Sequence, residues 1–170
     1  LASAFQIVGA PALLKTALNG YDGKGQARVN SFADLEAAFE DLGAVPCVLE
    51  AWLLLQTEIS VVVARGADGL AAAFPAAENR HANGILDISI APAPVAAALA
   101  GKALETAMAI AAALDYCGVL AVEFFVLDDG GLLINEIAPR PHNSGHYTLN
   151  ACLTSQFEQQ VRALAGLPLG

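Results

Sequence analysis

The sequence has 170 residues, of which 56% are hydrophobic and 15% are charged, and its formal net charge is −9. This composition can fill the core of one compact domain or two small lobes, and it excludes a disordered chain. The acidic balance, without a basic stripe to follow a phosphate backbone, argues against nucleic-acid binding and leaves a small anionic ligand open. No stretch reaches the roughly 18 unbroken apolar residues of a membrane helix, so we expect a soluble protein.

The three cysteines, Cys47, Cys117 and Cys152, are widely spaced and form no CxxC pair. This spacing argues against a disulfide framework or a zinc site, and it favours small buried side chains in a reducing cytoplasm. The chain begins at Leu1 without Met, and Gly170 follows a Leu-Pro-Leu run typical of the middle of a domain. We therefore expect a piece of a longer protein.

Apolar runs and turn residues alternate along the chain in the manner of short strands and helices. Two helix starts have capping-box spacing, Ser31 with Asp34 and Ser155 with Glu158. A long helix in the middle of the chain has one apolar face, formed by Leu99, Ala103, Ala107, Ile110 and Leu114. The mixture predicts an α+β fold, with strands at residues 12–16 and 27–29, a helix from residue 31, strands at 47–49 and 59–64, a helix at 95–116, strands at 119–127 and 132–137, and a last helix from about residue 155.

The last two predicted strands form a hairpin with one glutamate in each strand. A turn centred on Asp129-Gly130, the favoured kind of two-residue turn, places Leu127 opposite Leu132. Continuing the count places Glu123 opposite Glu136. Residues directly opposed in this way have Cβ atoms about 5 Å apart.

Two opposed carboxylates in otherwise apolar strands repel each other unless a cation neutralises them. Mg²⁺ prefers one or two carboxylates together with phosphate oxygens, and Asn135 could add an amide oxygen. The pair of Glu123 and Glu136 therefore predicts a Mg²⁺ site. The alternative is that one glutamate points to solvent beyond a bulge, and a register shift of one residue would remove the opposition.

A glycine-rich segment follows the first predicted strand. Its glycines free the backbone to turn sharply and to approach a ligand, and successive N–H groups can cradle phosphate. The segment matches neither Walker A nor GxGxxG, so its own residues leave a plain hairpin loop and a phosphate lid equally open. Lys15, a charged strand residue just before it, favours the lid. The segment consists of Gly20, Tyr21, Asp22, Gly23, Lys24, Gly25 and Gln26.

The loop after Glu136 is dense in polar groups and bounded by prolines, which exclude a regular helix. Arg140 offers a planar fork for phosphate or carboxylate, and His142 can donate a proton or a hydrogen bond near neutral pH. Asn143 and Ser144 supply neutral hydrogen bonds. His142 and His146 have a spacing that binds metal on a helix, but the prolines argue against that site here. Because the loop follows the suspected metal strand, we interpret it as a substrate loop rather than plain surface.

Three segments, GYDGKGQ at residues 20–26, NEIAPRPHNSGH at residues 135–146 and SQFE at residues 155–158 with Arg162-Ala163, resemble the 5-(carboxyamino)imidazole ribonucleotide synthase family. The resemblance runs essentially from end to end, and the segment around Arg140 is its most specific part. It implies an ATP-grasp fold, in which two lobes close on ATP. The small lobe would be residues 1–50 and the larger, incomplete lobe residues 51–170, with the family's N- and C-terminal domains missing.

The resemblance also implies roles for individual residues, with ATP and Mg²⁺ as cofactors. In the small lobe, Lys15 contacts the phosphates and the glycine-rich segment folds over them. Glu123 and Glu136 bind Mg²⁺, and Arg140 and His142 act in catalysis. The remaining implied contacts are Glu50, Ala51, Trp52 and Leu53 at the adenine hinge, Glu58 at the ribose, His81 and Asn135 in the nucleotide site, and Arg140, His142, Asn143 and Ser144 at the substrate.

The implied reaction belongs to purine biosynthesis and has two stages. Bicarbonate attacks the γ-phosphate of ATP to give carboxyphosphate and ADP, and the carboxyphosphate, or CO₂ released from it, then carboxylates the amine of 5-aminoimidazole ribonucleotide. The resemblance further implies a cytoplasmic homodimer. The same module fused to the next enzyme of the pathway would look identical in this segment.

Two other classes of function stay open. One is a different ATP-grasp ligase, such as the formate-dependent glycinamide ribonucleotide transformylase or biotin carboxylase, against which the segment from Arg140 to His146 argues. The other is a nucleotide-binding module without turnover. The presence of Lys15, Glu123 and Glu136 counts against that module, because a degenerate site would be free to lose them.

Overall fold

The computed structural model describes residues 1–20 and 24–170. The chain divides into two compact units: Leu1–Leu54 with Asn83–Ile85, and Leu55–Ala82 with Leu86–Gly170. The sequence analysis placed the boundary between the lobes after residue 50, and the structure divides the chain after Leu54. Among the described residues, no helix is long and apolar enough to cross a membrane.

The first unit is a three-stranded antiparallel sheet with two helices packed against it. The strand order is β2-β1-β3. The side chains of Leu14, Val29 and Leu35 form the centre of its core. The predicted helix cap is confirmed, since the Asp34 backbone N–H donates to Ser31 Oγ at 3.1 Å. Its elements are α1 (Ala2–Val8), which the sequence analysis did not predict, β1 (Ala12–Thr16), β2 (Gln26–Val29), α2 (Phe32–Asp41) and β3 (Cys47–Ala51).

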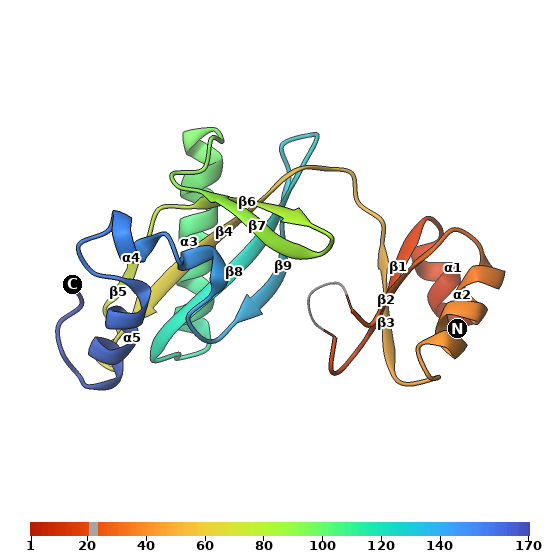
Figure 1. The fold of residues 1–170 in the computed structure, drawn as a ribbon, viewed down its shortest axis with the longest axis horizontal. Coiled ribbons are helices and arrows are strands. Elements are labelled where there is room, and N and C mark those ends of the chain that lie inside the picture. Colours follow the sequence, from red (N-terminus) through yellow and green to blue (C-terminus); the bar gives the residue numbers. More distant parts are fainter. Residues whose placement is uncertain (21–23) are drawn as a thin grey trace. The chain divides into compact units, whose positions relative to one another are not determined.

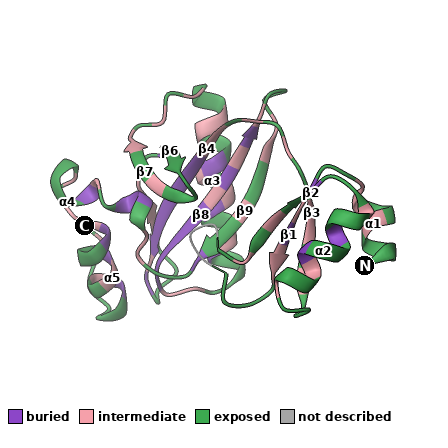
Figure 2. Cartoon of the chain, turned by 45° about the vertical axis from the view of Figure 1, so that its right-hand side comes forward, coloured by how far each residue is buried: buried purple, intermediate pink, exposed green. Residues whose placement is uncertain are grey.

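The second unit is built on a six-stranded antiparallel sheet. Strand order along the main path is β7-β6-β4-β8-β9, and β5 pairs with β4. Long strands β4 and β8 lie at the centre and are mostly buried, as Figure 2 shows. Its elements are β4 (Leu55–Arg65), β5 (Ala71–Ala73), β6 (Ala77–Ala82), β7 (Ile85–Ile90), α3 (Ala97–Ala113), β8 (Gly118–Leu127), β9 (Leu132–Ala138), η1 (Asn143–Gly145), α4 (Thr148–Ala151) and α5 (Gln156–Leu164).

Helix α3 covers one face of this sheet (Figure 1). Its buried stripe is Ala103, Ala107 and Ala111, so small side chains bring the helix close to the strands. The prediction that Leu114 belongs to this stripe was wrong: the helix ends at Ala113, and Leu114 is 58% exposed.

The opposite face of the sheet is divided between an apolar and a polar half. The apolar half is a small cluster around Val62, Val119 and Ala121, and α5 contacts β4 and β8. The other half of the face carries polar side chains. It is this half that the candidate site occupies.

The hairpin formed by β6 and β7 was not predicted, although the sequence carries its signal. Asn83 and Gly84 connect the two strands with positive φ angles of 54° and 78°. Asn-Gly with both residues in this conformation is typical of a two-residue hairpin turn. Strand β6 has little apolar alternation. In β7, however, Leu86, Ile88 and Ile90 alternate with polar residues, so part of the signal was readable and was overlooked.

Candidate functional site

A row of three directly opposed residues crosses the centre of the polar half-face. Ser60 in β4 pairs with Glu123 in β8, and Glu123 pairs with Glu136 in β9. Directly opposed residues of antiparallel strands point to the same side of a sheet. The predicted opposition of Glu123 and Glu136 is therefore confirmed.

The register that produces this opposition differs from the predicted one near the turn. Leu127 was predicted opposite Leu132, but its N–H donates to the carbonyl of Gly131, and Leu132 faces Val126. Gly130 has a φ of 81°, as in a three-residue turn closed by a residue in the left-handed region. The ladder then shifts by one residue between Glu123 and Phe124. This second irregularity restores the predicted pairing of Glu123 with Glu136.

Asn135 is the extra residue at that shift, because Ile134 pairs with Phe124 and Glu136 pairs with Glu123. A bulge of this kind leaves one residue out of the ladder and re-aims its side chain. The Asn135 side chain makes a hydrogen bond to Glu123. The bulge thus places the Asn135 amide beside Glu123, and the role of its amide oxygen as a metal ligand stays a prediction.

Glu123 lies in surroundings that disfavour its ionised form. Its side chain is 13% exposed. Burial, and then the neighbouring charges of Glu136 and Glu58, raise the pKa of Glu123 from its ordinary 4.5 to about 7, against the opposing effects of Arg140 and Asn135. A carboxyl group held at this pKa attracts either a proton or a cation near neutral pH.

Ser60, on the other side of Glu123, has a buried hydroxyl that lacks a partner. The residue is 1% exposed, and Ser60 Oγ makes no hydrogen bond to any of the described residues. Leaving a buried hydroxyl unpaired costs about 1 to 3 kcal/mol. The atom therefore marks a place where a bound group would find a ready partner beside Glu123.

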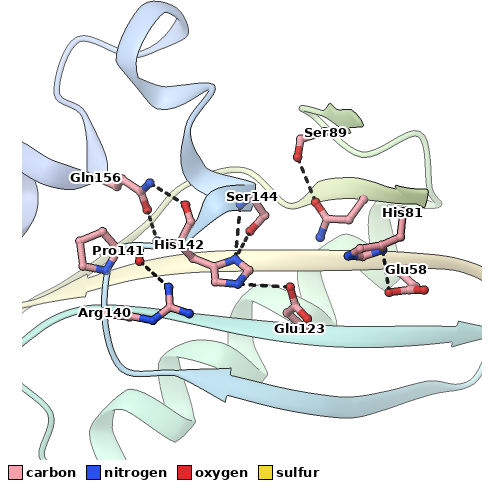
Figure 3. Close-up of polar contacts among 10 residues, drawn as sticks. Glu58, His81, Ser89, Glu123, Arg140, Pro141, His142, Ser144 and Gln156 are labelled. Atoms are coloured by element: carbon pink, nitrogen blue, oxygen red, sulfur yellow. Dashed lines mark hydrogen bonds and ion pairs between the residues drawn. The ribbon is translucent and has the colours of Figure 1, made fainter. Parts of the chain in front are cut away.

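His142 lies over the same row, in the loop that follows β9 (Figure 3). Its Nδ1 accepts a hydrogen bond from the Ser144 backbone N–H at 3.3 Å and lies 2.9 Å from Ser144 Oγ. Because Nδ1 is an acceptor, the ring hydrogen of the neutral imidazole belongs to Nε2. Nε2 lies 3.6 Å from Glu123 Oε1.

The imidazole of His142 is held in its neutral form. Burial, followed by the charges of Arg140, His146 and His81, lowers the pKa of His142 from its ordinary 6.5 to about 4. At neutral pH the ring therefore directs an Nε2–H towards Glu123 and carries no charge. Of the two abilities predicted for His142, hydrogen-bond donation fits this environment, and release of a proton from an imidazolium does not.

Glu58 and His81 form a second polar pair on the same side of the sheet. Glu58 faces Asn79 across β4 and β6, and His81 Nδ1 lies 3.3 Å from Glu58 Oε2. The charge of Glu58 acts on Glu123, and that of His81 acts on His142. The structure thus brings together Glu58 and His81, assigned to the nucleotide, with Glu123, assigned to the metal, and His142, assigned to catalysis and the substrate.

The other predicted residues of the loop after β9 differ in how far they are buried. Arg140 is exposed, and its Nη1 donates to the Pro141 carbonyl at 3.0 Å. Asn143 is exposed and Ser144 is fully buried. His146 stacks on Phe157 with ring centroids 5.8 Å apart. This stacking gives His146 a packing role, in keeping with the prediction that His142 and His146 do not form a metal site.

The first unit carries Lys15 and Glu50 on the sheet face opposite its core, whereas Ala51 pairs with the core residue Ala12. Lys15 Nζ lies 2.7 Å from Glu50 Oε2. Arg28, which the sequence analysis did not single out, lies over the Trp52 ring at 4.4 Å from its centroid. Lys15 and Arg28 face Gln26 and Leu13 across the β1–β2 ladder, so both cations lie on one side of the sheet.

The glycine-rich segment is described in part. Gly25 has a φ of 75°, and a Cβ added to it would lie 2.6 Å from Thr16 Oγ1. The Gly25 carbonyl accepts a hydrogen bond from the Thr16 N–H at 2.8 Å. Glycine is therefore required at this position by both conformation and space. Tyr21, Asp22 and Gly23, which were predicted to contact phosphate, lie outside the described residues.

The chain matches the family model described as the ATP-grasp domain over residues 1–157. The chain belongs to the ATP-grasp domain family. The predicted α+β ATP-grasp fold is thereby confirmed. Within the family, the chain is 51% identical over all its 170 residues to the N5-carboxyaminoimidazole ribonucleotide synthase of Bacillus subtilis (strain 168).

Solved ATP-grasp structures show the same similarity. An ADP complex of an N5-carboxyaminoimidazole ribonucleotide synthetase superposes with a TM-score of 0.93 at 48% identity, over 99% of this chain and 45% of that one. The synthase of Aspergillus clavatus in complex with ADP and 5-aminoimidazole ribonucleotide gives a TM-score of 0.91 at 36% identity, over 99% of this chain and 44% of that one. The chain also spans 45% of the Bacillus relative, so it corresponds to less than half of these proteins.

Two residues of this ATP-grasp chain escaped the sequence analysis for different reasons. Ser60 is one small residue in a β-branched strand, and nothing in its neighbours marks it as unpaired. Arg28 lies two residues after the glycine-rich segment, and its alternation with Gln26 places it on the face of Lys15. That alternation was readable from the sequence.

Proposed function

We propose that the full-length protein carboxylates 5-aminoimidazole ribonucleotide with ATP and bicarbonate, forming N5-carboxyaminoimidazole ribonucleotide in purine biosynthesis. One observation carries the proposal. The chain is 51% identical to such a synthase. In this chain Glu123 and Glu136, the residues of the predicted metal site, are directly opposed on a polar sheet face. His142 lies against the same pair.

The residues present fit a divalent cation. Two opposed carboxylates, an amide from Asn135 and a free buried hydroxyl at Ser60 form a set of oxygen donors of the kind Mg²⁺ prefers. Among the described residues there is no group of three or more His, Cys, Asp or Glu side chains suited to a metal. A pair of carboxylates is sufficient when phosphate oxygens complete the coordination, which is the usual arrangement for Mg²⁺ with nucleotides.

Glu123 and Glu136 would hold Mg²⁺, and the cation would offset the charge of the phosphates during phosphoryl transfer. The protein's own part is mainly to position the reactants. Neutral His142 would orient bicarbonate or the substrate through its Nε2–H, and exposed Arg140 would bind the anionic ribonucleotide. Lys15 and the glycine-rich segment would contact phosphates in the first unit. Glu50 and residues 51–53 would contact adenine, Glu58 the ribose, His81 and Asn135 the nucleotide site, and Asn143 and Ser144 the substrate.

The proposed chemistry balances in two steps. A bicarbonate oxygen forms a bond to the γ-phosphorus as the bond to the ADP oxygen breaks, which gives carboxyphosphate. The exocyclic amine then forms a bond to the carboxyl carbon, directly or after release of CO₂, and inorganic phosphate leaves. Shielding from water is needed because carboxyphosphate would otherwise hydrolyse.

The proposal includes a cytoplasmic homodimer, as the resemblance implies. Three free cysteines, Cys47, Cys117 and Cys152, fit a reducing compartment. Sedimentation of the full-length protein would test the dimer. A monomer at micromolar concentration would remove that part of the proposal and leave the reaction unaffected.

The reaction is tested by ADP release from ATP by the full-length protein. We expect release to require 5-aminoimidazole ribonucleotide and bicarbonate together, and to fall by at least about a hundredfold in Glu136→Gln, because one of the two metal carboxylates is lost. ADP release that is indifferent to both co-substrates would overturn the proposed function. Unchanged Mg²⁺-dependent release by Glu136→Gln would overturn the metal assignment alone.

A further inference from the structure

The backbone of His142 is held on both sides by a single buried side chain. The His142 N–H donates to Gln156 Oε1 at 2.9 Å, and Gln156 Nε2 donates to the His142 carbonyl at 2.7 Å. Gln156 is the first residue of α5 and is fully buried. Figure 3 shows the amide lying against His142 on the side away from Glu123. One glutamine thus fixes the position and direction of the peptide from which the imidazole projects.

The start of α5 is itself fastened to the same loop. The Gln156 backbone N–H donates to Thr148 Oγ1 at 3.0 Å, and Thr148 Oγ1 donates to the Gly145 carbonyl at 2.6 Å. Thr148 is fully buried. The contacts link His142, Gly145 and the first turn of α5 into one closed hydrogen-bond network. Such a network is rigid because every member is satisfied.

Gly145 leaves the space that the Gln156 amide occupies. A Cβ added to Gly145 would lie 2.7 Å from Gln156 Cδ. Real Cβ atoms do not approach other heavy atoms so closely, so even a methyl group would displace the amide. The absence of a side chain at Gly145 is therefore a condition for the contact between Gln156 and His142.

From these contacts we infer that Gln156, with Gly145 as its partner in space, is the positioning residue that sets His142 against Glu123. The inference rests on the proposed function for the identity of the substrate. Gln156 makes its hydrogen bonds to the His142 backbone, not to the imidazole that would meet a ligand. Its effect is to hold the neutral ring so that Nε2 stays 3.6 Å from Glu123 Oε1.

A second glutamine of the same helix supplies a matched control. Gln159 is 3% exposed, its Nε2 donates to the Gly170 carbonyl at 2.7 Å, and its Oε1 accepts from the Gly170 N–H at 3.1 Å. It makes the same two-bond contact with a backbone peptide as Gln156, three residues further along α5. Its target, Gly170, is not part of the candidate site.

The experiment compares Gln156→Met, Gly145→Ala and Gln159→Met in the full-length protein. We expect Gln156→Met and Gly145→Ala to speed amide hydrogen exchange in residues 140–147 and leave residues 118–127 unchanged. Because loss of positioning by about 1 Å can cost roughly a hundredfold in rate, kcat/KM for 5-aminoimidazole ribonucleotide should fall by about that factor. KM for ATP should stay within about twofold, and Gln159→Met should leave both the exchange of residues 140–147 and the kinetics near wild type.

Two outcomes would overturn the positioning role of Gln156, and one would overturn the proposed function. If Gln156→Met leaves the exchange of residues 140–147 and the ribonucleotide kinetics unchanged, or if Gln159→Met impairs them equally, Gln156 is an ordinary structural residue. If the wild-type protein does not use the ribonucleotide but the exchange pattern is as expected, the proposed function fails and the positioning of His142 stands. If Gln156→Met does not fold, Gly145→Ala decides, because it keeps every hydrogen-bonding group and changes only the space that the amide needs.

Discussion

Glu123 is the residue at which folded-state stability and the proposed function oppose each other. Because burial and its acidic neighbours raise the pKa of Glu123 to about 7, the folded chain keeps a proton that the unfolded chain loses from about pH 4.5. The folded state therefore loses stability as the pH rises from 4.5 to 7. At about 1.4 kcal/mol for each pKa unit, the loss amounts to about 3 kcal/mol at pH 8.

His142 contributes with the opposite sign. Its pKa is lowered to about 4 from 6.5, so the unfolded chain takes up a proton that the folded chain refuses. Stability from this residue is present above pH 6.5 and is lost as the pH falls towards 4. Between pH 4.5 and 6.5, stability falls with pH because of Glu123 and rises with pH because of His142, so the two pH dependences largely cancel. Above pH 7 the penalty of Glu123 stands alone.

We therefore predict that Glu123→Gln stabilises the full-length protein at pH 8 in the absence of nucleotide and divalent cation. The amide removes a disfavoured charge, and the melting temperature should rise by a few degrees. Mg²⁺-dependent ATP turnover should be lost in the same variant. Differential scanning calorimetry and an ADP-release assay measure the two effects.

Glu105→Gln is the control for that experiment, because Glu105 is an exposed carboxylate on α3. Its removal should change the melting temperature by no more than about 1 °C, as is usual for surface substitutions. A melting temperature of Glu123→Gln at or below that of wild type would show that Glu123 is not disfavoured in the folded protein.

At the scale of elements, the β8–β9 hairpin places its two glutamates together by two departures from regular pairing. The three-residue turn at Gly130 moves the register by one residue, and the bulge at Asn135 moves it back. The sequence predicted the opposition of Glu123 and Glu136, but neither departure. Asp129-Gly130 suits a two-residue or a three-residue turn, and only packing of both strand faces selects between them.

We expect the bulge to give Asn135 a measurable effect on binding of the proposed cation. Its hydrogen bond lowers the pKa of Glu123, so Asn135→Ala should raise that pKa above about 7 and leave less of the ionised carboxylate at neutral pH. We expect the Mg²⁺ concentration for half-maximal turnover at pH 7 to increase several-fold in Asn135→Ala. At pH 8.5 the difference from wild type should shrink, because Glu123 is ionised in both proteins. An equal difference at both pH values would show that Asn135 acts on the cation directly rather than through Glu123.

Other elements show where sequence patterns were sufficient and where they were not. The starts of α2 and α5 were predicted from their capping pairs, and both are confirmed. The Asp34 N–H donates to Ser31 Oγ, and the Glu158 N–H donates to Ser155 Oγ. Strand β4 was predicted from its β-branched run, but β6 and β7 were not. Strand β6 is mostly polar and lacks the apolar alternation that reveals a strand packed on a core. In β7, Leu86, Ile88 and Ile90 do alternate with polar residues, and this signal was overlooked.

At the scale of the whole molecule, the two faces of the six-stranded sheet explain why the site residues come from distant parts of the sequence. One face is covered by α3, and on the second face one half is apolar and the other half carries the polar side chains of the candidate site. Residues Glu58, His81, Glu123 and His142 meet there from four segments. The segments of Glu58, Glu123 and His142 were predicted, whereas strand β6 with His81 was not. Ser60 and Gln156 were not singled out, because an unpaired hydroxyl and a buried amide are properties of the assembled fold.

The chain spans 45% of its Bacillus relative, so the proposed reaction is to be tested on the full-length protein. The claim at the centre of the account is that bicarbonate attacks ATP beside Glu123 and Glu136. Its most direct test is to supply ¹⁸O-labelled bicarbonate with ATP, Mg²⁺ and 5-aminoimidazole ribonucleotide, and to measure the label in inorganic phosphate. We predict one labelled oxygen in each phosphate released, since the attacking oxygen stays on phosphorus when the carboxyl group departs. Phosphate released without label, while the ribonucleotide is carboxylated, would contradict the account.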